Sequence, residues 1–188
     1  MQWTNTSNGY GSTAIALHWL SVAAVAILIP LGLWMTDLDY YDPWYVKGPD
    51  IHRALGVLFA IVLLLRLTVR LTQQRPVPLT SSPAQAAGVR WVHRLLYLLP
   101  GLLVISGYLV STADGRAVDV FDWFSVPATL HGIEHQADIA GDVHFALAMT
   151  LLGVVAAHAG AAFHHHFIAR DATLRRMLRP GTASSQTN

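Results

Sequence analysis

Four long apolar stretches constrain this chain more than any other feature of its sequence. They lie at about 14–35, 54–72, 91–111 and 143–168. Each is close to the ~20 residues that a helix needs to cross a hydrocarbon core of about 30 Å. Charged residues make up only 12% of the chain, about half of the roughly 25% found in soluble domains. The sequence therefore predicts an all-α fold, an integral membrane four-helix bundle.

The remaining segments predict no second folded unit. Residues 1–180 are expected to form a single transmembrane domain, followed by a flexible tail at 181–188. The stretch "RPVPLTSSPAQAAG" at 75–88 has the composition of a polar, proline-rich linker between the second and third spans. The chain contains no cysteine, which excludes disulfides, thiolate metal sites and iron–sulfur clusters on this chain.

The loops between the spans differ in the sign of their charge. The segment 66–94 holds five arginines and no acid, and the C-terminal segment after 168 holds four arginines and one acid. By contrast, 36–50 holds four acids and one lysine, and 112–142 holds six acids and one arginine. Because arginine and lysine gather on the cytoplasmic side of membrane proteins, both termini are predicted to be cytoplasmic, with 36–50 and 112–142 outside.

Histidines inside the spans are the most informative polar residues. In this orientation His18 and His158 lie in the cytoplasmic leaflet, whereas His52 and His144 open their spans in the outer leaflet. The four histidines therefore form two depth-matched pairs. His144 and His158 are both on the fourth span, about 21 Å apart along a helix and on nearly the same face.

Ionisable side chains at membrane depth are costly and usually functional. Iron bound by two neutral imidazoles would satisfy their lone pairs and fix a planar cofactor between helices. Small residues beside the histidines would leave room for such a macrocycle: Gly56, Ala148, Gly153, Ala157 and Ala159. We therefore expect two haems, one in each leaflet, with their irons roughly 20 Å apart.

Two other interpretations of the histidines remain open at this point. A single intramembrane histidine is often an interhelical hydrogen-bond donor, and small residues also serve plain helix packing. Zinc or copper ligation would instead make the chain a non-redox, histidine-rich metal-binding membrane protein, although such sites usually need three or four converging ligands. In the outer loop, His131 and His135 with Glu134 could bind a metal or simply be solvated.

Several motifs occur together along the chain. They are "LHW" at 17–19, "IHRALGV" at 51–57, "LLLRLTVRL" at 63–71, a histidine at 93 that opens the third span, histidines at 144 and 158, and "HHFIARDATLRRML" at 165–178. In this combination the chain resembles the bacterial cytochrome b561 family, four-helix inner-membrane proteins that hold two b haems. The resemblance covers roughly residues 10–178.

This resemblance implies that His18 and His158 ligate the iron of an inner haem b, and that His52 and His144 ligate an outer one. It also implies a bacterial inner-membrane protein that exchanges electrons with the quinone pool, through ubiquinone or its quinol, and with a periplasmic or membrane redox partner. Some relatives are superoxide:ubiquinone oxidoreductases. Here the acidic outer loops would repel an anionic substrate, and Lys47 and Arg53 are the main cations that could offset them.

Three more polar residues are candidates for the inner site. Arg66 and Arg70 are one turn apart on the second span and would suit haem propionates, although they also fit the positive-inside pattern without binding anything. His93 lies at a similar depth and could be a competing ligand, a propionate or quinone partner, or a surface histidine. His165 could act as a ligand only if the inner haem lay at the membrane interface.

Overall fold

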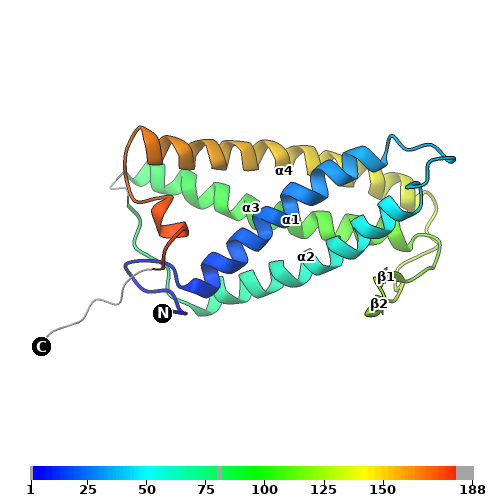
Figure 1. The fold of residues 1–188 in the computed structure, drawn as a ribbon, viewed down its shortest axis with the longest axis horizontal. Coiled ribbons are helices and arrows are strands. Elements are labelled where there is room, and N and C mark those ends of the chain that lie inside the picture. The colour runs from blue at the N-terminus through cyan, green and yellow to red at the C-terminus, as the bar shows by residue number, and fades with distance from the viewer. Residues whose placement is uncertain (1, 80–81, 181–188) are drawn as a thin grey trace, which may run out of the picture.

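The computed structural model describes residues 2–79 and 82–180 and consists of four long helices and a small hairpin (Figure 1). The helices are α1 (Ser12–Met35), α2 (Lys47–Thr72), α3 (Pro83–Thr112) and α4 (Gln136–Phe167), followed by the short 3-10 helix η1 (Arg175–Met177). All four long helices are long and apolar enough to cross a membrane. The predicted all-α membrane bundle is confirmed.

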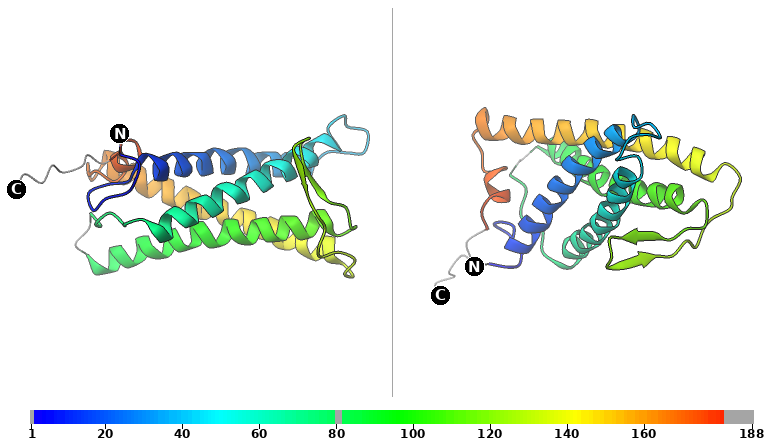
Figure 2. Two further views of the ribbon diagram at one scale, coloured as in Figure 1. Left: turned by 90° about the horizontal axis from the view of Figure 1, so that it is seen from below. Right: turned by 45° about the vertical axis from the view of Figure 1, so that its right-hand side comes forward.

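The helices pack in sequential pairs. α1 lies along α2 and α3 lies along α4, with further contacts between α2 and α3, whereas α4 makes few close backbone contacts with α1 or α2 (Figure 2). Buried apolar side chains of the described spans are few and include Phe59, Leu99 and Leu151. Close helix packing is therefore sparse between α4 and the α1–α2 pair.

The bundle has two ends that differ in structure. The inner end consists of residues 2–11, 73–79 and 168–180, and the outer end consists of residues 36–46 and 113–135. The start of α1 and the helix η1 lie together at the inner end (Figure 1). The two terminal segments lie at the same end because the chain crosses the bundle an even number of times. The cytoplasmic location of the inner end stays a prediction from charge.

Three helices begin well before the apolar stretches that predicted them. α2, α3 and α4 begin at Lys47, Pro83 and Gln136 rather than near 54, 91 and 143. At α3, the Ser82 side chain accepts a hydrogen bond from the Gln85 N–H, and Pro83 follows as a first helical residue, a usual helix start. The predicted linker at 75–88 is therefore wrong from Pro83 onward. The predicted tail at 181–188 lies outside the described residues.

The outer end carries the hairpin of β1 (Val118–Val120) and β2 (Phe124–Val126), in which Val118 pairs with Val126. Strand β1 packs against α2, and Val118 and Val120 are buried. The fully buried Thr112 hydroxyl lies 2.9 Å from the Tyr108 carbonyl oxygen and 3.0 Å from that of Leu130. These contacts fix the chain where it leaves α3.

Three segments are joined at the inner end. Trp19 Nε1 donates to the Met177 carbonyl at 2.8 Å, which ties the C-terminal segment to α1. The Arg176 guanidinium donates to the Val77 carbonyl at 2.7 Å, and the Val77 N–H donates to the Ser7 carbonyl at 2.9 Å. The N-terminal, α2–α3 and C-terminal segments therefore form one connected layer across this end.

Candidate functional site

The inner histidines come from the first and last helices. His18 on α1 and His158 on α4 are half-buried, and their ring centres are 6.5 Å apart with an angle of 71° between the ring planes. His93 on α3 is also in this cluster, because its ring centre lies 5.6 Å from that of His158. The structure thus brings three histidines together near the inner end.

The outer histidines come from α2 and α4. The ring centres of His52 and His144 are 6.2 Å apart, with 76° between the planes. Since α4 runs without interruption from Gln136 to Phe167, the fourteen residues from His144 to His158 correspond to about 21 Å along the helix axis. One helix contributes a histidine to each pair. Whether these histidines are ligands stays a prediction.

Two arginines of α2 border the inner pair. Arg66 donates a hydrogen bond to His18 Nδ1 at 3.0 Å. The guanidinium carbons of Arg66 and Arg70 lie 5.2 and 5.0 Å from the centre of the Tyr97 ring on α3, which is within cation–π range. Both predicted arginines are therefore in the inner cluster, and Tyr97 is a member that the sequence analysis missed.

A serine orients the outer histidine on α4. Ser106 Oγ donates to the Leu103 carbonyl at 3.2 Å and lies 3.0 Å from His144 Nδ1. When the serine proton is directed at Leu103, the serine oxygen can accept the Nδ1–H of His144. The lone pair of His144 is then on Nε2, the nitrogen left free to bind a metal. Such outer hydrogen bonds fix the tautomer of metal-binding histidines.

Two glycines provide the room for the outer imidazoles. A Cβ on Gly32 of α1 would lie 3.1 Å from His52 Cε1, and a Cβ on Gly107 of α3 would lie 3.1 Å from His144 Cε1. Each outer histidine therefore packs against a glycine of the neighbouring helix. Gly56 and Gly153, predicted to leave room for a macrocycle, have open space within 4 Å of the position that a Cβ would take, and their role in clearance stays a prediction.

The other histidine clusters have different surroundings. His165 Nδ1 lies 2.6 Å from Asp171 Oδ2, so this residue belongs to the inner-end layer. His135 is exposed, and its imidazole lies 3.5 Å from Glu134 and 3.7 Å from Asp138. Among residues 2–79 and 82–180, no group of three or more histidine, cysteine, aspartate or glutamate side chains could hold a metal ion.

Fold and site together are those of a four-helix membrane protein with two stacked histidine pairs in its interior. The chain belongs to the prokaryotic cytochrome b561 family, whose model matches residues 9–180. This is a family of membrane proteins that transfer electrons through b-type haem. The match and the bacterial relatives identify a multi-pass protein of the bacterial inner membrane.

Three relatives illustrate the similarity. The chain is 46% identical over 186 residues to Cytochrome b561 homolog 2 of Escherichia coli (strain K12), covering 98% of each chain. It is 27% identical to Cytochrome b561 homolog 1 of the same strain, over 91% of this chain and 97% of that one. It is also 27% identical to the Probable superoxide oxidase CybB of Yersinia pestis, over 90% and 95% of the two chains.

The residues present fit the b-type haem that the family implies. An iron between two imidazoles, at about 2 Å from each nitrogen and a further ~1 Å to each ring centre, sets the ring centres roughly 6 Å apart. The observed separations of 6.5 and 6.2 Å are close to this value.

Proposed function

We propose that this protein carries electrons across the bacterial inner membrane through two b haems and exchanges them with the quinone pool. His18 and His158 would hold the inner haem, and His52 and His144 the outer one. The observation that carries the proposal is the spacing of the two ring pairs, 6.5 and 6.2 Å between centres. When bound, each haem would supply a one-electron iron couple held by two imidazoles.

The surrounding residues would hold the axial imidazoles in the required protonation state. Ser106 Oγ, 3.0 Å from His144 Nδ1, would accept the Nδ1–H of His144 and so keep the Nε2 lone pair available. At the inner pair the present contact is different, because Arg66 donates to His18 Nδ1. An imidazole that binds metal through Nε2 carries its proton on Nδ1. Metal binding by His18 therefore requires Arg66 to turn away from that nitrogen.

Such a turn would release Arg66 for a negatively charged partner. Arg70 is one turn further along α2 and shares the Tyr97 ring with Arg66, so both guanidinium groups border the inner pair. Guanidinium groups bind carboxylates with two parallel hydrogen bonds. We therefore assign Arg66 and Arg70 to the propionates of the inner haem. His93, 5.6 Å from the His158 ring, would be a proton donor or acceptor for a quinone at the inner end.

A second candidate is superoxide oxidation coupled to reduction of ubiquinone. It is supported by the relative that is named Probable superoxide oxidase CybB, at 27% identity. The charge of the outer end opposes it, because 36–50 and 112–142 hold ten of the eleven acidic residues of the chain. A small anion would approach this surface against an unfavourable field. Quinol oxidation or quinone reduction, which needs no anion at the outer surface, is the better-supported function.

Spectroscopy of the purified protein tests the proposal. We expect a pyridine haemochrome assay to give two b haems per chain, and a reduced-minus-oxidised spectrum with two components. Replacing either member of a pair by alanine, as in His18→Ala or His52→Ala, should remove one haem and spare the other. His164→Ala is a matched control on α4, because this exposed residue belongs to neither pair, and it should keep both haems.

The outcomes separate the candidate functions. A colourless wild-type protein would refute haem binding altogether, and loss of neither haem in the alanine variants would refute the ligand assignment. Adding ubiquinol to the oxidised protein without oxygen should reduce the haems at a rate that saturates with quinol. If instead only a superoxide-generating system reduces them, the protein is a superoxide oxidase and the first proposal is wrong.

A further inference from the structure

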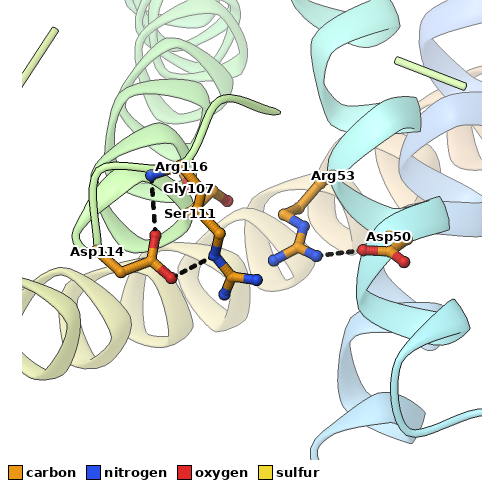
Figure 3. A network of polar contacts seen from close by, with 6 residues as sticks. All are labelled: Asp50, Arg53, Gly107, Ser111, Asp114 and Arg116. Atoms are coloured by element: carbon orange, nitrogen blue, oxygen red, sulfur yellow. Dashed lines mark hydrogen bonds and ion pairs between the residues drawn. The ribbon is translucent and has the colours of Figure 1, made fainter. Parts of the chain in front are cut away.

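The outer end is acidic, with few basic residues. The acids of 36–50 and 112–142 are Asp37, Asp39, Asp42, Asp50, Asp114, Asp119, Asp122, Glu134, Asp138 and Asp142. Only three basic residues, Lys47, Arg53 and Arg116, lie in or next to these segments. Two of the three, Arg53 and Arg116, point toward one another (Figure 3). Like charges that converge in an acidic region suggest a site for an anionic group between them.

The backbone and the exposed side chain of Arg116 both bind one carboxylate. Asp114 accepts a hydrogen bond from the Arg116 N–H at 3.1 Å and another from Arg116 Nε at 2.6 Å. These two hydrogen bonds lower the pKa of the Asp114 carboxyl below its usual value and keep it charged, and the backbone hydrogen bond has the larger effect. Because Asp114 binds Nε, the two terminal nitrogens of Arg116 remain available, with no hydrogen bond among the described residues.

Arg53 is fixed in the same way from the other side. It forms an ion pair with Asp50 one turn earlier on α2, through a single terminal nitrogen. Figure 3 shows Asp50 and Asp114 behind the two guanidinium groups, which face each other between α2 and the end of α3. Each acid holds its arginine in place and leaves donors directed at the intervening space. A carboxylate is the group that best fits guanidinium donors in this arrangement.

Both arginines lie on segments that also contribute to the outer histidine pair. Arg53 directly follows His52 in α2. Arg116 follows the end of α3, whose last two turns contact His144 through Ser106 and Gly107. The buried Thr112, bonded to two carbonyl oxygens, fixes the short connection between them. A cofactor held by His52 and His144 would therefore have one of its edges near Arg53 and Arg116.

We propose that Arg53 and Arg116 form a carboxylate clamp for the propionates of the outer haem. This inference rests on the proposed function, because it requires a haem at the outer pair. A free anion would have the same chemistry but would have to reach the clamp through a region that holds ten acids. A propionate arrives covalently attached to a cofactor that two histidines already bind, so long-range repulsion does not exclude it.

The potential of the outer haem provides the test. Arg53→Gln and Arg116→Gln each remove one positive charge beside a propionate. Oxidised iron carries one more positive charge than reduced iron, so losing the arginine charge favours the oxidised state. We expect the equilibrium constant for reduction of the outer haem to fall roughly tenfold, which lowers its potential by about 59 mV for one electron. Loss of the clamp should also make the propionate easier to protonate, so the potential should become more dependent on pH between about 5 and 7.

Two further variants serve as controls. Lys47→Gln removes the same charge from the outer end, but no hydrogen bond or ion pair among the described residues joins Lys47 to Arg53, Arg116 or their acids, and it should leave the potential nearly unchanged. Arg116→Lys retains the charge but not the fork of donors, and it should give an intermediate potential. Should Arg116→Gln lose the outer haem completely, recovery of the haem in Arg116→Lys would support the clamp as well.

The remaining outcomes are distinguishable. If both haems are present and the glutamine variants match Lys47→Gln in potential and pH dependence, the clamp is refuted and the proposed function stands. If potentials are unchanged but reduction by a superoxide-generating system slows, the arginines receive a free anion and the propionate assignment is wrong. A wild-type protein without an outer haem refutes the clamp together with the proposed function.

Discussion

The contact between Gly107 and His144 gives a prediction that separates cofactor binding from fold stability. A Cβ at position 107 would lie 3.1 Å from His144 Cε1 and 3.3 Å from Nδ1, whereas carbon atoms in comfortable contact are about 3.5–4.0 Å apart. In Gly107→Ala the imidazole therefore has to move by about 0.4 Å or more. A ligand geometry tolerates only about 0.5 Å before binding suffers.

The size of the effect follows from the cost of overpacking. Inserting a methyl group into a filled site typically costs about 1–3 kcal/mol, so the outer haem should bind roughly 5- to 150-fold more weakly. Alanine is also the better helix former, by about 1 kcal/mol. That gain stabilises α3 with and without haem, so it cancels from the binding equilibrium. We expect weaker outer-haem binding without a loss of helical structure.

Haem titration and circular dichroism of purified Gly107→Ala would measure the two quantities separately. Gly32→Ala should behave similarly, because its Cβ would lie 3.1 Å from His52 Cε1. Gly88→Ala is the matched control on α3, where glycine is exposed and a Cβ meets nothing within 4 Å. If Gly107→Ala and Gly32→Ala bind two haems as tightly as Gly88→Ala does, the two glycines do not position the outer histidines.

Two further predictions concern single hydrogen bonds. Ser106→Ala removes the oxygen that would accept the His144 Nδ1–H, and the imidazole then donates less electron density to oxidised iron. The potential of the outer haem should therefore rise by up to about 60 mV. An unchanged potential in a redox titration would contradict this role. Asp171 has its pKa lowered to about 2, chiefly by hydrogen bonds from Thr173 and then from His165. A depressed pKa means that this carboxylate stabilises the C-terminal segment above pH ~4 and that the stabilisation is lost as the pH falls toward 2. At neutral pH, Asp171→Asn should speed amide exchange in residues 168–179 roughly two- to fivefold, and exchange equal to that of Asp122→Asn, a control at the outer end, would refute it.

Hydropathy and charge predicted the bundle because a helix in lipid must be apolar along the whole length that crosses the hydrocarbon core. A stretch near 20 residues without charge marks what lies in hydrocarbon, and the four helices were located in this way. The helix starts were not, because a helix continues into water wherever a polar segment can cap it. Ser82 and Pro83 show that a local signal was present, although the surrounding proline-rich composition suggested a linker.

The histidine pairs could be anticipated from depth alone, but their immediate partners could not. Depth along a helix follows from counting residues, so His18 falls opposite His158 and His52 opposite His144. Which small residue touches a ring depends instead on helix rotation and crossing angle. The contacts of Gly32 and Gly107 with the outer imidazoles therefore could not be predicted from the sequence. Tyr97 and Ser106 lie on α3, which carries no member of either pair.

The arrangement of the helices gives the cofactors a structural role in addition to a redox one. α1 packs on α2 and α3 on α4, but each histidine pair joins α4 to a helix of the other packed pair, where close backbone contacts are few. In the proposed function, iron–imidazole bonds would link α4 to α1 near the inner end and to α2 near the outer end. A ligand that binds only the folded state stabilises it by mass action, so haem binding and bundle assembly would be coupled. The same bonds would also offset the cost of placing four histidines at membrane depth.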